Sequence, residues 1–199
     1  TMLCRDKART QYALEAAGLP MPELCTEHHR FPEKLSAWGS GFIKPRYGAL
    51  GQNVSCVVSG LDLPETLEGV VPGCQEQSIL QKGVGPPSGW AGMSVRQLVQ
   101  RAADGSWLTR PAVLRRSRTD RVVNVARGAE AVPAGDCLPK KTTDMIHSLS
   151  LQAARLLQST PSGAFSVEFG IDYVIDETYS PWLIEVNSRP RGRLEVLAE

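Results

Sequence analysis

Two consecutive strand-like segments, residues 165–176 and 182–187, limit the possible folds of this chain more than any other part of its sequence. In the first segment every second residue is apolar, the period of a strand with one buried face; these residues are Phe165, Val167, Phe169, Ile171, Tyr173 and Ile175. In the second segment one face carries Trp182, Ile184 and Val186, and the other carries Leu183, Glu185 and Asn187. A short polar stretch separates the segments, so they predict an antiparallel hairpin.

The register of this hairpin predicts two carboxylates opposite each other. If Asp176 pairs with Pro181, Asp172 lies across from Glu185 at about 5 Å, with Asn187 one step along the same face. Like charges at such positions repel each other, and two carboxylates with an amide oxygen suit Mg²⁺ or Mn²⁺. A solvated polar face with screened charges is the alternative interpretation. Because repulsion would be relieved, we expect Asp172→Asn or Glu185→Gln to leave the stability of the metal-free protein unchanged or raised.

The remaining pattern predicts an α+β fold with mostly antiparallel strands. Three helices are expected. The first begins at Asp6, carries Tyr12, Ala16 and Leu19 on one side and ends at Gly18. The other two begin at about residue 63 and after Pro139. Expected strands cover 41–44, 53–58, 78–81, 94–101, 107–116 and 121–126. A loop rich in Gly and Pro, residues 83–92, is expected to separate two lobes.

Composition excludes several classes of protein. The 199 residues carry 22 Lys and Arg against 21 Asp and Glu, a balance that gives no overall attraction to nucleic acid or membrane. The five cysteines are odd in number and lack Cys-x-x-Cys spacing, so we expect free thiols and a cytoplasmic protein. Neither a membrane-spanning run nor a signal peptide is expected. The basic residues Arg96, Arg110, Arg115, Arg116, Arg118 and Arg121 favour phosphate or carboxylate contacts over nucleic acid.

A glycine-bearing turn follows one expected strand. Lys44 ends that strand, and Gly48 and Gly51 flank the turn that comes next. Backbone N–H groups in such a turn can bind a phosphate while the lysine supplies charge. An ordinary hairpin with a basic residue and two glycines explains the same pattern.

Together these segments resemble, in order, the ATP-grasp superfamily of carboxylate–amine ligases. The resemblance is closest to its RimK-like ligases and its YheC/YheD-like group. It rests on RDKARTQYALEAAGLPMP, FIKPRYGALGQNV, SILQKGV, SVRQLVQ, LRRSRTDRVVNVARGAEA, EFGIDYVID and WLIEVNSRPRG. It implies two α+β lobes that grip ATP, an N-terminal lobe over 1–83 and a C-terminal lobe over 84–199. Because relatives have a further domain before these lobes, we expect a missing N-terminal domain or a homo-oligomer.

The resemblance also implies roles for single residues. Lys7 and Lys44 would contact the ATP phosphates, and Gly48 and Gly51 would let a loop close over them. The adenine hinge would consist of Gln81, Lys82, Gly83 and Val84. Arg96 and Arg116 would face the γ-phosphate or the substrate carboxylate. The magnesium or manganese ligands would be Asp172, Glu185 and Asn187, with Asn124 nearby. Arg189 would meet the acceptor substrate or pair with Glu168.

The implied reaction transfers the γ-phosphate of ATP to a carboxylate, and an amine then attacks the acylphosphate. Small-molecule carboxylate and amine substrates are therefore expected, of the amino acid or peptide type. Two departures, Ser94 where relatives have Asp and a single glycine before Ala129, leave open a noncatalytic nucleotide-binding or spore-coat-type structural protein that retains the fold.

Overall fold

The computed structural model describes residues 2–47, 54–60, 78–123, 125 and 128–188. The chain divides into two compact units, a small unit over 22–84 and a large unit that joins 1–21 to 85–199. We expected residues 1–21 in the N-terminal lobe, but Leu14, Leu19 and Met21 belong to the core of the large unit. The backbone N–H of Leu183 also donates to Pro20 O at 2.9 Å. None of the helices in the described ranges is long and apolar enough to cross a membrane.

The small unit is a four-stranded antiparallel sheet with one helix on it. Its strands lie in the order β1-β4-β2-β3, and its elements are β1 (Leu24–Cys25), η1 (His28–Arg30), α3 (Phe31–Trp38), β2 (Ser40–Pro45), β3 (Ser55–Val58) and β4 (Ser78–Lys82). Phe31 and Leu35 of α3 pack against Ile43, Val57 and Leu80 of the sheet. The expected hairpin is confirmed, because β2 pairs with β3. The helix expected near residue 63 lies outside the described residues.

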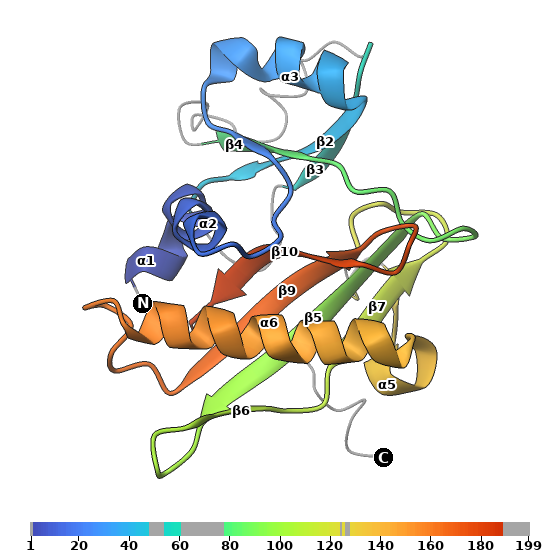
Figure 1. Ribbon diagram of the computed structural model, residues 1–199. Helices are drawn as coiled ribbons and strands as arrows, with labels where there is room; N and C mark the ends of the chain where they lie inside the picture. Colours follow the sequence, from blue (N-terminus) through green and yellow to red (C-terminus); the bar gives the residue numbers. More distant parts are fainter. Residues whose placement is uncertain (1, 48–53, 61–77, 124, 126–127, 189–199) are drawn as a thin grey trace. The chain divides into compact units, whose positions relative to one another are not determined.

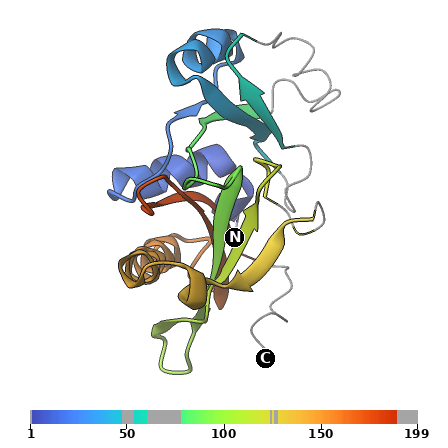
Figure 2. The same cartoon turned by 90° about the vertical axis from the view of Figure 1, so that its right-hand side faces the viewer.

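The large unit is a six-stranded sheet with a long helix across one face (Figure 1). The sheet follows the order β10-β9-β5-β7-β8, and β6 pairs with β5. The strands are β5 (Gly92–Arg101), β6 (Trp107–Thr109), β7 (Val113–Ser117), β8 (Glu130–Pro133), β9 (Glu168–Ile175) and β10 (Pro181–Asn187). The helices are α1 (Met2–Arg5), α2 (Lys7–Ala16), α5 (Ala134–Cys137) and α6 (Lys140–Gln158). Figure 2 shows α6 beside one face of β5, β7 and β8.

The alternation of β5 defines two faces of this sheet. Val95 and Val99 are fully buried in one core with Ile146 and Leu157 of α6, so their side of the sheet is here named the helix face. Because successive side chains of a strand point to opposite sides, Arg96 lies on the other side, named the polar face. Of the residues expected along one side of the first helix, Leu19 is buried, but Tyr12 is exposed.

Two of the expected strands differ in the structure. The strand expected over 107–116 divides into β6 and β7, because Pro111 has no N–H to donate and occupies the connection between them. The strand expected over 121–126 is absent from 121–123 and 125, the described part of that range. A turn stands there instead, in which Ser117 Oγ accepts from Asp120 N at 3.0 Å and Asp120 Oδ1 accepts from Val122 N at 2.8 Å. The chain returns to the sheet in β8.

The terminal hairpin also departs from the expected register. Pro181 pairs with Ile175 rather than Asp176, because the Asp176 carboxylate organises the turn by accepting from Thr178 N at 2.9 Å and Ser180 N at 2.8 Å. A bulge between Leu183 and Glu185 then restores the pairing of Glu185 with Asp172.

The bulge changes which residues are buried. Leu183 and Val186 both reach the core, so the simple alternation expected for this strand is wrong. The first strand begins at Glu168, and Phe165 and Val167 before it are exposed.

Candidate functional site

Six charged or amide side chains gather on the large unit where β10, β9, β5 and β7 meet α2. They are Lys7, Arg96, Arg115, Asp172, Glu185 and Asn187, here named the polar cluster. Strand pairing sets their positions. Arg96 is the register partner of Asp172 on one side, and Glu185 is its partner on the other. The bulge in β10 is therefore what brings Glu185 to this place.

Asp172 is at the centre of the polar cluster and is bound on both oxygens. Arg96 donates from Nε to Oδ1 at 2.8 Å and from Nη2 to Oδ2 at 2.6 Å, a two-point contact that fixes the carboxylate plane. Asn187 Nδ2 donates to Oδ2 at 3.3 Å. Burial alone lowers the pKa of Arg96, but its hydrogen bonds to Asp172 and the charges of Asp172 and Glu185 raise it above the ordinary value.

Arg115 is the cluster member that the sequence placed only in a general basic series, without a role of its own. Its register partner is Ser94, two residues before Arg96 on β5, so it lies on the polar face. Its Nη1 is 3.9 Å from Asp172 Oδ1. Burial lowers the pKa of Arg115; the charge of Asp172 opposes this effect and that of Arg96 adds to it. Alternation along β7 shows that only one of the adjacent residues Arg115 and Arg116 can lie on the polar face, but the sequence does not show which one.

Arg116, to which the resemblance gave a role at the γ-phosphate, lies away from the cluster. Its register partner Met93 belongs to the core on the helix face. Its guanidinium donates to both oxygens of Glu130, at 2.8 and 3.0 Å, and stacks 4.6 Å from the centre of the Trp90 ring. Adjacent side chains of a strand point to opposite faces, so Arg115, and not Arg116, shares the polar face with Asp172.

Lys7 joins the polar cluster from the first residue of α2. The helix begins there because Asp6 is its N-cap, with Oδ1 accepting from Arg9 N at 3.1 Å. Lys7 Nζ lies 3.6 Å from Glu185 Oε1, and its side chain is only 9% exposed. A lysine so deeply buried beside the cluster contributes positive charge to it.

The other expected site residues belong to the small unit. Lys44 on β2 and Gln81 on β4 are both buried, and Lys44 Nζ donates to Gln81 Oε1 at 2.7 Å. Lys82 pairs with Glu23 at 3.0 Å. Gly83 donates from its N–H to Ser40 O at 2.9 Å, and a Cβ at Gly83 would clash with Ser40 Oγ. These contacts hold 81–83 close to β2.

Four further residues with expected roles lie outside the described residues: Gly48, Gly51, Asn124 and Arg189.

The donor set of the polar cluster fits a hard divalent cation. Asp172 and Glu185 offer carboxylate oxygens, and Asn187 offers an amide oxygen once its amide turns from the orientation that donates to Asp172. The described residues contain no group of three or more His, Cys, Asp or Glu side chains that could hold a metal ion. A cation here would therefore depend on Asn187 and on oxygens of a bound ligand.

A protein-family model matches the larger part of the chain. Residues 63–196 match the family model described as YheC/D like ATP-grasp. No curated protein matches the chain.

Solved structures share the fold at low sequence identity. The biotin carboxylase domain of Hydrogenobacter thermophilus 2-oxoglutarate carboxylase has a TM-score of 0.72 and 15% identity over 96% of this chain and 41% of its own. The D-alanine-D-alanine ligase from Coxiella burnetii has a TM-score of 0.68 and 14% identity over 93% of this chain and 47% of its own. This chain thus spans less than half the length of these proteins.

The family model covers well over half of the chain, and the expected α+β architecture of two antiparallel sheets is the one observed. The chain has the ATP-grasp fold and belongs to the YheC/D-like ATP-grasp family.

Proposed function

We propose that the protein is an ATP-dependent ligase that activates a carboxylate as an acylphosphate and joins it to an amine. Membership of the ATP-grasp family supports this proposal at the level of ATP binding. The observation that carries it further is the polar cluster, where two carboxylates and an amide on one sheet lie beside two arginines of that sheet and Lys7 of α2.

The charges of this cluster favour an anionic ligand that carries a divalent cation. Lys7, Arg96 and Arg115 supply three positive charges, and Asp172 and Glu185 supply two negative ones. The cationic side chains are 9–19% exposed, so solvent screens them less than it screens surface groups. Positive charge placed in advance where negative charge develops is the main way in which proteins accelerate phosphoryl transfer.

Each residue of the cluster has a task in the proposed reaction. Asp172, Glu185 and Asn187 hold Mg²⁺ or Mn²⁺, which neutralises phosphate charge when bound. Arg96 and Arg115 orient the γ-phosphate and the substrate carboxylate by two-point hydrogen bonds, so that the carboxylate oxygen attacks in line. Lys7 adds charge to the phosphates. No protein nucleophile is required, because the substrate carboxylate is itself the nucleophile.

The small unit contributes the proposed contacts to the rest of the nucleotide. Lys44 contacts phosphate oxygens, and Gly48 and Gly51, which lie outside the described residues, keep their proposed place at the phosphates. The backbone of Gln81, Lys82, Gly83 and Val84 binds the adenine edge. The contacts among Lys44, Gln81, Ser40 and Gly83 support this assignment because they keep the lysine and the hinge in one rigid piece.

A noncatalytic nucleotide-binding or structural protein is the second candidate. One observation favours it: Asp172 is already neutralised by Arg96 and needs no metal ion for its burial. A carboxylate that stays in this pair would leave Glu185 and Asn187 alone to hold the cation. The two candidates therefore differ in whether Arg96 releases Asp172 when the nucleotide binds.

Hydroxylamine trapping separates the two candidates. The protein is incubated with Mg²⁺–ATP, hydroxylamine and a panel of amino acids and short peptides, and both phosphate and hydroxamate are measured. The ligase proposal predicts phosphate release that requires ATP, Mg²⁺ and a carboxylate, with one hydroxamate formed for each phosphate. Binding of Mg²⁺–ATP without phosphate release across the panel would support the noncatalytic protein, and absence of binding would contradict both.

A further inference from the structure

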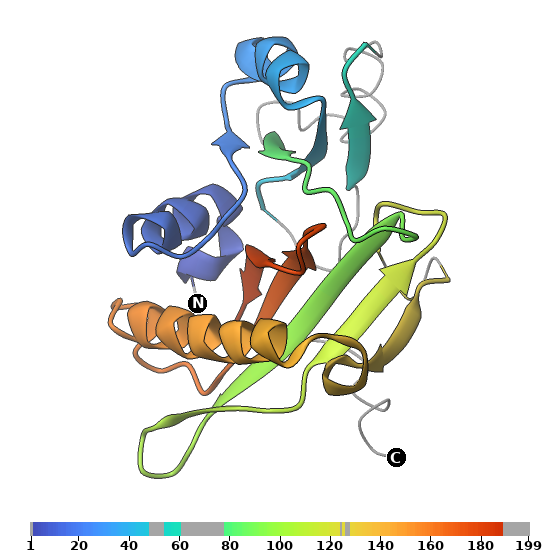
Figure 3. The same cartoon turned by 45° about the vertical axis from the view of Figure 1, so that its right-hand side comes forward.

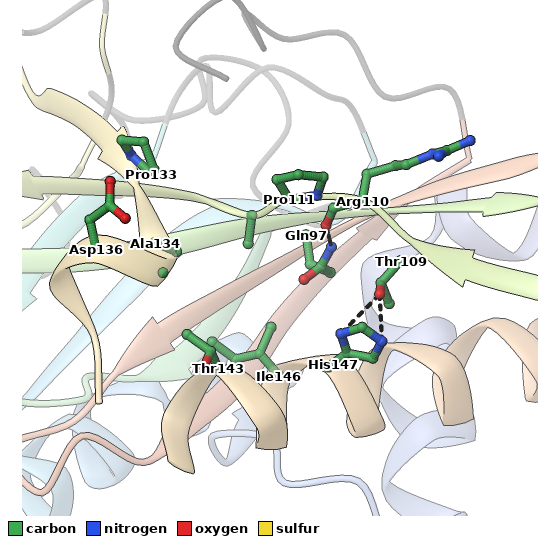
Figure 4. A pocket seen from close by; sticks show the side chains of 12 residues that line it. Gln97, Thr109, Arg110, Pro111, Pro133, Ala134, Asp136, Thr143, Ile146 and His147 are labelled. Atoms are coloured by element: carbon green, nitrogen blue, oxygen red, sulfur yellow. Dashed lines mark hydrogen bonds between the residues drawn. The ribbon is translucent and has the colours of Figure 1, made fainter. Parts of the chain in front are cut away.

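A cavity of about 390 Å³ lies on the helix face of the large unit, away from the polar cluster. Its lining residues come from β5, the connection between β6 and β7, the end of β8 with α5, and the first half of α6 (Figure 4). Figure 3 shows the ribbons of these elements. Gln97 of β5 lines it, whereas the adjacent Arg96 holds Asp172 on the opposite face. This volume is within the range of small-molecule sites in proteins. The cavity is thus separate from the proposed ligase site.

Gln97 is a polar residue in the apolar row of β5 that faces α6. Its neighbours in that row, Val95 and Val99, are fully buried, and Gln97 itself is 3% exposed. Its Nε2 donates to Leu98 O at 3.0 Å and also to Arg110 O. These two carbonyl acceptors fix the orientation of the amide, because a flipped amide would place oxygen against oxygen.

The remaining polar atom of the Gln97 side chain is the amide oxygen Oε1, a hydrogen-bond acceptor. Within the described part of the chain, Gln97 Oε1 accepts no hydrogen bond, and Figure 4 shows it turned toward the side of the cavity that Ile146 forms. The described residues contain no buried side-chain nitrogen or oxygen without a partner, so Oε1 is accessible from the cavity, and a ligand there can donate a hydrogen bond to it.

The walls of the cavity define the rest of the ligand. Pro111, Ala112, Pro133 and Ile146 form apolar surfaces that suit a flat apolar body. Asp136 of α5 provides a carboxylate that makes no ion pair with any described residue.

Arg110, a cationic residue of the cavity lining, is turned away from the cavity. The Arg110 guanidinium donates to Gln100 Oε1 at 2.7 Å, and Figure 4 shows its side chain leaving the other lining residues. The cavity therefore offers hydrogen-bond acceptors and one negative charge on an apolar base.

We propose that this cavity binds a small organic ammonium with an apolar, aromatic body. The ammonium group pairs with Asp136, the body packs on the two prolines and Ile146, and an N–H of the ligand donates to Gln97 Oε1. This site does not depend on the proposed ligase activity, because every residue that forms it lies on the helix face or its connections.

Three indoles that differ only in their charged or polar end test the proposal. Tryptamine carries an ammonium, tryptophol a hydroxyl and indole-3-propionate a carboxylate. Binding is measured by titration of the backbone amide signals of Ile146 and His147. The proposal predicts that tryptamine binds about fivefold more tightly than tryptophol, as expected for one partly exposed charge pair, and that indole-3-propionate binds most weakly.

Substitutions then identify the residues responsible. Asp136→Asn is expected to weaken tryptamine binding about fivefold and to leave tryptophol binding unchanged. Asp144→Asn is the matched control, because Asp144 lies on α6 but pairs with Lys140 at 2.7 Å outside the cavity. Ala112→Leu fills the cavity and is expected to abolish binding of all three compounds.

Several results would overturn the proposal. Equal affinity of the three indoles would leave an apolar cavity without charge preference, and absence of any shift at Ile146 and His147 would mean that the cavity does not bind them. Tryptamine affinity unchanged by Asp136→Asn would remove the assigned partner. Asp136 is exposed, so this variant remains informative even if Ala112→Leu fails to fold.

Discussion

At the scale of single residues, the Asp172 carboxylate decides how the site behaves without a ligand. The sequence suggested two acids that repel each other, so that removing one would be harmless or stabilising. The structure instead pairs Asp172 with Arg96 and brings Arg115 within 3.9 Å of it. Asp172 therefore offsets the charge of two partly buried arginines, and the expected relief of repulsion is replaced by a loss of pairing.

Asp172→Asn is accordingly expected to lower the free energy of unfolding of the ligand-free protein by about 2–4 kcal/mol, because it leaves Arg96 without its counter-charge. Glu185→Gln is the matched variant and should lower the free energy of unfolding by less than about 1 kcal/mol, since the Lys7–Glu185 distance of 3.6 Å gives a weaker ion pair. Urea unfolding measures both. If Asp172→Asn is as stable as the wild type, the Arg96–Asp172 pair is not formed in solution.

The neighbours Arg115 and Arg116 provide a second prediction at this scale. Arg115→Met is expected to weaken Mg²⁺–ATP binding about tenfold or more, because it removes a cation from the polar cluster. Arg116→Met is the matched control and should leave nucleotide affinity unchanged, since Arg116 pairs with Glu130 and stacks on Trp90. Equilibrium binding of a fluorescent ATP analogue gives both values. The opposite ranking of the two variants would support the role that the resemblance gave to Arg116.

At the scale of elements, the terminal hairpin shows what alternation can and cannot predict. The two strands and the pairing of Asp172 with Glu185 follow from the sequence pattern, and both are observed. The bulge was not predictable, because it depends on the five-residue turn that Asp176 organises, which shifts the register by one residue before the bulge restores it. Arg115 was missed for a related reason: only strand pairing decides which of two adjacent arginines shares a face with Asp172.

The turn gives a pH-dependent prediction. Burial alone raises the pKa of Asp176, but hydrogen bonds from Trp182, Thr178 and Ser180 outweigh it and lower the pKa below the ordinary value. A carboxyl group whose pKa is lower in the folded state stabilises that state above its unfolded pKa, about 3.9, and loses this contribution as the pH falls through the folded value.

Asp176→Asn is therefore expected to be less stable than the wild type by about 1–3 kcal/mol at pH 7, with a difference that shrinks as the pH falls below about 4. Thermal unfolding monitored by circular dichroism across this pH range measures the difference. Asp144→Asn, which removes an exposed pair on α6, should change stability by less than about 0.5 kcal/mol. A stability difference for Asp176→Asn that stays constant down to pH 2 would contradict the assigned hydrogen bonds.

At the scale of the whole molecule, the order of motifs was enough to predict the family and the α+β architecture. The division of the chain into two units was less predictable. An amphipathic pattern indicates that a helix packs against another element, but it does not identify the sheet against which it packs. Residues 1–21 pack with the C-terminal part through Leu14, Leu19 and the contact of Pro20 with Leu183. This arrangement puts Lys7 beside Glu185, although the two residues lie far apart in the sequence.

Calorimetry with a nonhydrolysable ATP analogue is the decisive test of whether the polar cluster binds a divalent cation together with a nucleotide. We expect tight binding in Mg²⁺, binding at least about tenfold weaker with excess EDTA, and the loss of this metal dependence in Glu185→Gln and Asn187→Ala. Equal affinity with and without Mg²⁺ in the wild type, or full metal dependence retained in both variants, would contradict this expectation.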